Sequence, residues 1–156
     1  MNVGTILLMR HAEKPADVGD IHLSKAGYAR ADKLASYIPQ TFGKPDFLFA
    51  AADSKNSVRP RETLEPLSQA IQVTIDASHP DDDYAALASK LLTKPHFEGK
   101  LTAVCWHHEK IPHFAKALGA TAGEYPHPWD PAVFNLILRF DFKGGQLTVK
   151  PITEPF

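Results

Sequence analysis

The apolar residues of this chain follow two spacings that alternate along the sequence. Short apolar runs predict strands, of which the first and last are apolar enough to be buried on both faces; they cover residues 3–9, 46–51, 71–75 and 101–106. Between these runs, apolar residues recur at i, i+3, i+4 and i+7, which is typical of one face of a helix. We expect these helices at residues 31–38, 57–71, 84–91 and 111–118.

Polar residues and a glycine mark the ends of several of these helices. Ser24 is a suitable N-cap for the first helix, because its hydroxyl can accept a hydrogen bond from a free backbone N–H. Residues 81–83 are all aspartate and place negative charge at the start of the third helix, where the helix dipole favours it. Gly119 is suited to end the fourth helix, since glycine readily adopts the left-handed conformation found there.

The order of these elements predicts an α/β fold. Strands that alternate with helices favour a three-layer α/β/α sandwich, a mostly parallel sheet with helices on both faces. Residues 134–142 then alternate strictly, and Gly144-Gly145 lead into residues 146–149, which predicts an antiparallel hairpin at the edge of the sheet. No shift in composition marks a boundary, so we expect residues 1–156 to form a single domain.

Composition excludes several classes of protein. The formal net charge of −1 creates no field that would attract nucleic acid or an anionic membrane, and no apolar run reaches transmembrane length. Cys105 is the only cysteine, so an internal disulfide is excluded and a reducing, cytoplasmic location is expected. Because Cys105 has apolar neighbours within a predicted strand, we expect an inert core thiol.

Candidate chemistry collects where the predicted strands end. Ligands of open α/β sheets bind at the carboxyl ends of the strands. The first strand ends in Arg10-His11 and the fourth in His107-His108, while Arg59 lies in the first turn of the helix that follows the second strand. Guanidinium groups bind phosphoryl oxygens in pairs, and an imidazole can act as a nucleophile or a donor. This combination indicates a site for a phosphoryl group.

Four segments strengthen this interpretation: LLMRHAEKP, LSKAGYARADKLASYI, SKNSVRPRETLEPLSQAI and TAVCWHHEKIPHFAKALG. In this order they resemble the motifs of the histidine phosphatase superfamily, which has the phosphoglycerate-mutase-like fold. The first segment is the Arg-His-Ala-Glu-Lys variant of the superfamily's Arg-His-Gly signature. The resemblance extends over nearly the whole chain.

The resemblance implies a metal-independent phosphatase, a phosphoric monoester hydrolase that acts through a phosphohistidine intermediate. His11 would be the nucleophile, and Arg10, Arg59 and His108 would bind the phosphoryl oxygens. The implied substrate is a phosphomonoester or phosphohistidine, carried by a phosphorylated small molecule or a phosphoprotein. Neither a metal nor another cofactor is implied, and no nucleic acid or membrane partner is expected.

The second catalytic histidine has two candidates. His107 and His108 are adjacent in a strand, so their side chains face opposite sides and only one can take the role. We choose His108, because the spacing from it to the following helix suits the superfamily.

The proton donor is the least defined part of the site. Many members of the superfamily have an acidic residue after the third strand that protonates the leaving group. Asp82 or Asp83 could serve in this chain, but both also fit a solvated helix cap. Some small phosphohistidine phosphatases of the superfamily have no such acid.

The sequence departs from the superfamily pattern at further positions. Ala12 and Pro60 replace the common glycine and alanine, and Glu109 stands where glycine is common. A carboxylate that points inward would oppose phosphate, so we expect Glu109 to point outward. Glu13 and Lys14 either line the mouth of the pocket or form an exposed ion pair.

Other functions are weighed against the phosphatase. A mutase would need a closing lid, and between residues 71 and 101 there is room for only one helix and short loops. A module that binds phosphoryl ligands without turnover is the alternative from another class. His108 and His113 are five residues apart and Pro112 interrupts the turn, which excludes a zinc-protease helix. We expect residues 119–131 to form a wall of the pocket.

Overall fold

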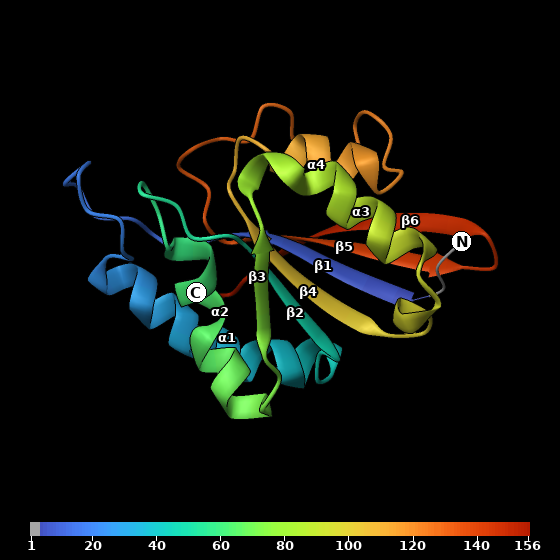
Figure 1. Cartoon of the computed structure of the whole chain (residues 1–156), viewed down its shortest axis with the longest axis horizontal. Helices are drawn as coiled ribbons and strands as arrows, with labels where there is room; N and C mark the ends of the chain where they lie inside the picture. The colour runs from blue at the N-terminus through green and yellow to red at the C-terminus, as the bar shows by residue number, and fades with distance from the viewer. Residues whose placement is uncertain (1–3) are drawn as a thin grey trace.

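A central sheet of six strands organises the computed structural model, which describes residues 4–156 (Figure 1). The strands are β1 (Gly4–Arg10), β2 (Phe47–Ala51), β3 (Ile75–His79), β4 (Leu101–Trp106), β5 (Leu136–Lys143) and β6 (Gln146–Thr153). The helices are α1 (Lys25–Phe42), α2 (Arg59–Ile71), α3 (Tyr84–Thr93) and α4 (Ile111–Ala117), with two 3₁₀ turns, η1 (Asp81–Asp83) and η2 (Pro95–Phe97).

The strand order across the sheet is β3-β2-β4-β1-β5-β6. The pairs β1–β4, β2–β4 and β2–β3 are parallel, whereas β5 runs antiparallel to β1 and β6 antiparallel to β5. The mostly parallel sheet with an antiparallel hairpin at one edge is therefore confirmed. Because β1 and β4 are adjacent, their carboxyl ends present Arg10 and Trp106 side by side.

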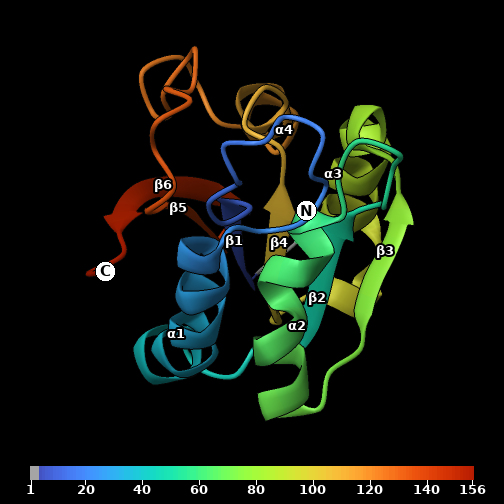
Figure 2. The same ribbon diagram turned by 90° about the vertical axis from the view of Figure 1, so that its left-hand side faces the viewer.

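Helices cover both faces of the sheet, as expected for the three-layer sandwich (Figures 1 and 2). Successive strand residues point to opposite faces. Leu7 and Met9 of β1 belong to a core cluster with α1 and α2, whereas Ile6 and Leu8 belong to a cluster with α3 and α4. Cys105 is buried in the first of these clusters, where burial raises the pKa of its thiol, as suits an inert core residue.

Several predicted element ends are confirmed and one strand is displaced. The Ser24 hydroxyl accepts a hydrogen bond from the Gly27 N–H (3.0 Å), and Gly119 has a φ of +107° just after α4. The strand expected at residues 71–75 lies instead at Ile75–His79. Ile71 remains in α2, where it packs into the core, and the helix ends at Gln72 in the left-handed conformation.

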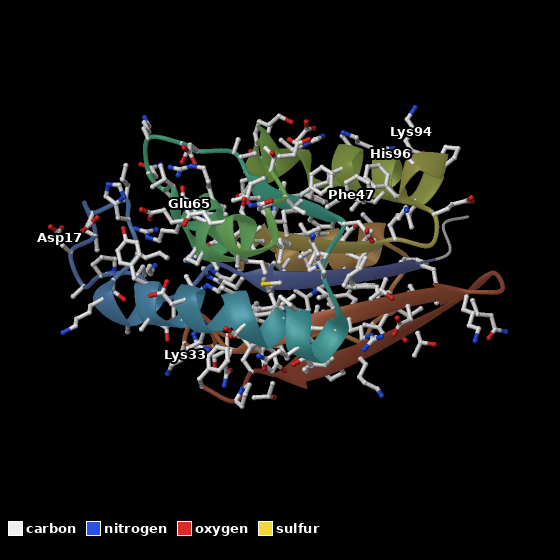
Figure 3. All side chains as sticks on the ribbon, turned by 90° about the horizontal axis from the view of Figure 1, so that it is seen from below. Asp17, Lys33, Phe47, Glu65, Lys94 and His96 are labelled. Carbon is white, nitrogen blue, oxygen red and sulfur yellow. The ribbon has the colours of Figure 1, made fainter. Side chains whose placement is uncertain are left out.

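Aromatic side chains pack at the other end of the sheet, where the parallel strand β2 begins. Phe47, at the start of β2, contacts the rings of His96 and Phe97, with centroid distances of 4.8 Å to each (Figure 3). This contact fixes η2 against the sheet.

Candidate active site

A cavity of about 400 Å³ opens at the carboxyl ends of β1 and β4. It brings together the predicted residues Arg10, His11, Arg59 and His108, and it adds several that the sequence did not single out. The full lining is Arg10, His11, Lys14, Ser54, Asn56, Ser57, Arg59, Asp81, His107, His108 and Glu109.

His11 lies on the floor of the cavity, immediately after β1. The residue is 3% exposed, and its backbone N–H donates to the Trp106 carbonyl of β4 (3.1 Å). The ring Nδ1 lies 2.7 Å from the Ala12 carbonyl oxygen, which can only accept, so Nδ1 carries the proton and Nε2 keeps a free electron pair. Burial lowers the pKa of His11 to about 3, so the imidazole is neutral and able to act as a nucleophile.

Arg10 supplies a buried positive charge next to His11. Its Nη1 donates to the carbonyls of Pro131 (2.7 Å) and Val133 (3.3 Å), and its guanidinium carbon lies 3.8 Å from the centre of the Phe134 ring. Nε and Nη2 are buried and have no hydrogen-bond partner within residues 4–156. Burial, reinforced by the charge of Arg59, lowers the pKa of Arg10 to about 10. Two buried donors without a partner are the clearest sign of an anion site.

Arg59 is held by the loop that joins β1 to α1. Its Nε donates to the His22 carbonyl (2.9 Å), and its Nη2 donates to the Asp20 carbonyl. Nη1 faces the Ser57 hydroxyl at 3.4 Å. Burial lowers the pKa of Arg59 from its ordinary value. As at Arg10, the partners are neutral oxygens, so the positive charge remains available to an anion in the cavity.

Thr63 joins the helix that carries Arg59 to the floor. Its hydroxyl donates to the Arg59 carbonyl (2.8 Å) and accepts from the Ala12 N–H (2.9 Å). The segment that carries His11 and the helix turn that carries Arg59 are therefore fixed to each other through one buried side chain, although they are far apart in the sequence.

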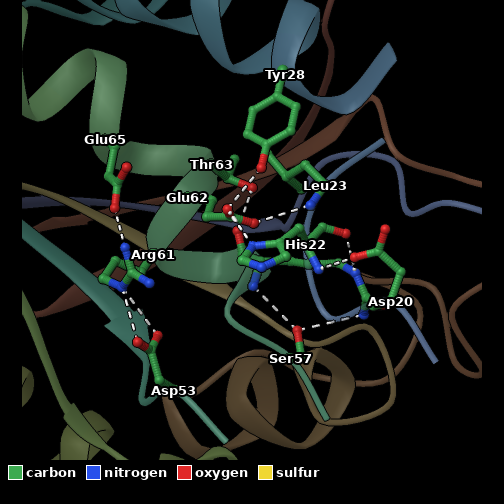
Figure 4. Close-up of polar contacts among 11 residues, drawn as sticks. Asp20, His22, Leu23, Tyr28, Asp53, Ser57, Arg61, Glu62, Thr63 and Glu65 are labelled. Carbon is green, nitrogen blue, oxygen red and sulfur yellow. Dashed lines mark hydrogen bonds and ion pairs between the residues drawn. The ribbon is translucent and has the colours of Figure 1, made fainter. Parts of the chain in front are cut away.

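Glu62 attaches the β1–α1 loop to the first turn of α2 (Figure 4). Its carboxylate accepts from the Leu23 N–H (3.0 Å), the His22 ring Nδ1 (2.9 Å) and the Tyr28 hydroxyl (2.8 Å). The loop protrudes beyond this attachment, and Val18 near its tip is fully exposed.

Arg61 does not line the cavity, although it is two residues from Arg59. It is paired with Asp53 (3.0 Å) and with Glu65, as Figure 4 shows.

The histidine beside His11 is His107, not His108, which the sequence analysis chose. Arg10 pairs with Trp106 across the parallel strands, so the next residues of each strand, His11 and His107, also lie side by side. Their ring centroids are 5.4 Å apart. Burial, together with Arg59, lowers the pKa of His107 to about 4. His108 also lines the cavity, and burial and the charge of Arg10 lower its pKa, but the ring that lies next to His11 is that of His107.

Of the three aspartates at residues 81–83, the one that lines the cavity is Asp81, not Asp82 or Asp83 as expected from the sequence. Asp82 is 85% exposed and pairs with Lys110 (3.1 Å), and Asp83 is exposed. Trp106 Nε1 donates to the Asp81 carbonyl (3.0 Å) and so fixes Asp81 against the end of β4. The Asp81 Oδ1 is buried and lacks a hydrogen-bond partner within residues 4–156, and burial raises the pKa of Asp81 to about 6.

The lining of the cavity differs from the prediction at Glu109 and at the loop 119–131, and it separates Glu13 from Lys14, for which two alternatives were open. Glu109 lines the cavity and does not point away from it. Lys14 also lines it, whereas Glu13 pairs with Arg30 (2.9 Å). The described lining includes no residue of the loop 119–131, whose Trp129 is buried in the core. That loop contributes instead through the Pro131 carbonyl, which holds Arg10.

Two searches of the described part of the chain returned nothing. Residues 4–156 contain no group of three or more histidine, cysteine, aspartate or glutamate side chains placed to hold a metal ion. In the same range, no helix combines the length and apolar character needed to span a membrane.

No protein-family model and no curated protein sequence matches this chain, whereas several solved structures match its fold. Protein histidine phosphatase SixA, complexed with tungstate, has a TM-score of 0.66 at 14% identity, and 96% of each chain is covered. A phosphoserine phosphatase from Entamoeba histolytica has a TM-score of 0.64 at 15% identity, with 97% of this chain and 98% of that chain covered. A phosphoglycerate mutase from Plasmodium falciparum has a TM-score of 0.64 at 16% identity, with 96% and 90% covered.

These three structures belong to the histidine phosphatase superfamily. The chain has the phosphoglycerate-mutase-like fold of that superfamily, as its motifs predicted.

Proposed function

We propose that this chain is a metal-independent phosphatase that hydrolyses a phosphomonoester or phosphohistidine through a phosphohistidine intermediate on His11. The observation that carries the proposal is the state of His11 itself. It is buried and neutral, with Nδ1 bound to the Ala12 carbonyl and Nε2 free, and Arg10 beside it has two buried donors without a partner in residues 4–156.

In the first step, Nε2 of His11 bonds to phosphorus while the bond from phosphorus to the leaving group breaks. Arg10, Arg59 and His107 bind the non-bridging oxygens and stabilise the charge that grows on them, which is the main catalytic task in phosphoryl transfer. The Ala12 carbonyl holds the Nδ1 proton, so the positive charge of the phosphorylated ring is stabilised by a hydrogen bond. His108, on the wall of the same cavity, contacts the phosphoryl group from the side.

Asp81 serves as the proton donor and later as the acceptor. A pKa raised to about 6 leaves part of the Asp81 population protonated near neutrality, so its proton can pass to the leaving oxygen. The resulting carboxylate then takes a proton from water as the water oxygen bonds to phosphorus. The bond from phosphorus to Nε2 breaks, its electron pair returns to the ring, and inorganic phosphate leaves.

Hydrolysis suits this cavity better than a mutase reaction. Between α2 and β4 the chain contains only β3, α3 and two 3₁₀ turns, so the described segment holds no insertion large enough to close over a substrate. Water therefore has access to the intermediate. The names of the structural neighbours include a protein histidine phosphatase and a phosphoserine phosphatase, and they support this choice.

Hydrolysis of p-nitrophenyl phosphate in the presence of a chelator tests the proposal. We expect His11→Ala to lower kcat/KM at least about 10³-fold between about pH 5 and 8, because the nucleophile is lost. His113→Ala is the matched control, since His113 is exposed and lies outside the cavity lining. Equal activity in the wild type and His11→Ala would overturn the proposal. Binding of phosphate without turnover in the wild type would favour a binding module instead.

A further inference from the structure

The mouth of the cavity contains a carboxylate that a phosphate site does not need. Glu109 lies in the turn between β4 and α4, which is closed by hydrogen bonds from the Lys110 and Ile111 N–H groups to the His107 carbonyl (3.1 and 3.2 Å). This turn places Glu109 directly after the two cavity histidines. From there its negative charge acts on the cavity. It raises the pKa values of His107 and His108, which burial lowers, and it adds to burial in raising the pKa of Asp81.

The charge of Glu109 is not used in an ion pair of the protein. The neighbouring Lys110 pairs with Asp82, and within residues 4–156 no lysine or arginine forms a salt bridge with Glu109. A carboxylate in this position repels a dianionic phosphoryl group on the cavity floor. A substrate that brings its own positive charge to the mouth offsets this repulsion and gains an attraction to Glu109.

The cavity therefore has two electrostatic zones. The floor is positive, because Arg10 and Arg59 are held by neutral carbonyls. A second part of the lining is acidic, because Asp81 and Glu109 line the same cavity and lie close enough for their charges to act on each other. Lys14 adds one ammonium group at the mouth, on the loop after β1. One ammonium group and two carboxyl groups in this part of the lining fit a substrate whose leaving group is cationic or zwitterionic.

We propose that Glu109 is a specificity-determining residue that selects phosphorylated substrates with a positively charged nitrogen a few bonds from phosphorus. Aminoalkyl phosphates represent this class, and substrates with a second anion near the phosphoryl group are disfavoured. The inference rests on the proposed function, since it assumes that the floor binds the phosphoryl group.

Binding to the His11→Ala variant tests the inference without turnover. Calorimetric titration compares phosphoethanolamine, ethyl phosphate and 3-phosphoglycerate, which carry a cationic, a neutral and an anionic group beside the phosphate. We expect phosphoethanolamine to bind about tenfold more tightly than ethyl phosphate, and 3-phosphoglycerate to bind more weakly than ethyl phosphate. With Glu109→Gln added, the three dissociation constants should converge to within about threefold.

Glu98→Gln is the matched control, because Glu98 is exposed and lies outside the cavity lining. It should leave the order of the three ligands unchanged, and Glu109→Gln should leave the unfolding temperature unchanged, since Glu109 is exposed as well.

Equal affinity for phosphoethanolamine and ethyl phosphate would overturn the inference while phosphate binding stands. If neither the three ligands nor inorganic phosphate bound, the inference would fail together with the assumption that the cavity floor binds a phosphoryl group. The catalytic proposal fails on a different result: equal hydrolysis of p-nitrophenyl phosphate by the wild type and by His11→Ala.

Discussion

Arginine side chains have different kinds of partner in the cavity and in a second region, the Arg30 network, in which Arg30 of α1 binds Glu13 and Glu154. In the cavity, Arg10 and Arg59 donate to backbone carbonyls, and burial lowers the pKa of both. In the network, Arg30 donates to both oxygens of Glu13 and to Glu154 (2.8 Å), and these carboxylates raise its pKa. A carbonyl orients a guanidinium group without neutralising it, whereas a carboxylate uses up its charge. The partners of an arginine thus separate a binding group from a structural one.

The two regions also differ in their buried carboxyl groups. Burial raises the pKa of Asp81 in the cavity to about 6 and that of Glu154 in the network to about 7. Glu154 is bound by Arg30, whereas Asp81 Oδ1 has no hydrogen-bond partner in residues 4–156. Similar shifts in pKa therefore accompany different roles.

The largest effect expected from this difference is on catalysis, in Arg10→Ala. This change removes the guanidinium group that the Pro131 and Val133 carbonyls hold. It should lower kcat/KM about 10³-fold, because Arg10 stabilises the charge that develops on the phosphoryl oxygens. Steady-state hydrolysis of p-nitrophenyl phosphate measures the effect. Arg61→Ala is the control, since Arg61 is paired with Asp53 and Glu65 outside the cavity lining, and it should retain wild-type activity. Similar losses in both variants would contradict the distinction between the two kinds of arginine.

The next effect is on stability, in Arg30→Met. This change leaves Glu154, which is 3% exposed, buried without its cation, and should lower the free energy of unfolding by about 3 kcal/mol at pH 8. The folded-state pKa of Glu154 is raised, so the folded state favours the neutral acid and stability falls as pH rises from the ordinary value of 4.5 through about 7. The loss should therefore be smaller near pH 6.

Urea denaturation of Arg30→Met and of the double variant Arg30→Met/Glu154→Gln measures this effect. The double variant should recover most of the loss, because the buried carboxyl is then absent. Activity per folded molecule should stay within about twofold of the wild type. A large loss of activity in a folded Arg30→Met protein would show that the network also serves the cavity.

The smallest of these effects is expected for Asp81→Asn and depends on the leaving group. With an alkyl phosphate, kcat of the wild type should fall as pH rises through about 6, because Asp81 loses the proton that the leaving oxygen needs. In Asp81→Asn this fall should disappear, and kcat near pH 5 should be lower by about 100-fold. p-Nitrophenolate leaves without a proton, so its release should change much less.

Asp82→Asn serves as the control for Asp81→Asn, because Asp82 is exposed and paired with Lys110. It should keep the wild-type pH profile with both substrates. If Asp82→Asn instead removed the fall above pH 6, the exposed aspartate would be the proton donor, as the sequence had suggested.

The floor of the site could be predicted from sequence because short-range patterns determine it. An apolar run that ends in Arg10-His11 places these residues at the carboxyl end of a buried strand, and the structure has them there. Arg59 lies in the first turn of α2, close to the predicted start of that helix. Each position follows from an element and its end, so the sequence carried enough information.

The choice between His107 and His108 required the register between two strands. The side of β4 that faces His11 depends on the pairing of Arg10 with Trp106, which joins segments far apart in the sequence. Asp81 depends on a similar long-range contact, the hydrogen bond from Trp106 Nε1 to its carbonyl. Three consecutive aspartates look alike in sequence, and this bond selects the first of them.

The attachment of the β1–α1 loop by Glu62 has a consequence for how such a protein could diversify. The contacts that hold Arg59 begin at Asp20, whereas Val18 near the tip is fully exposed. Figure 3 shows Asp17 at the outer end of the loop, away from the sheet. The tip can therefore change in length and sequence over evolutionary time without displacing Arg59, and an insertion there is a route to new substrates that leaves the floor of the cavity intact.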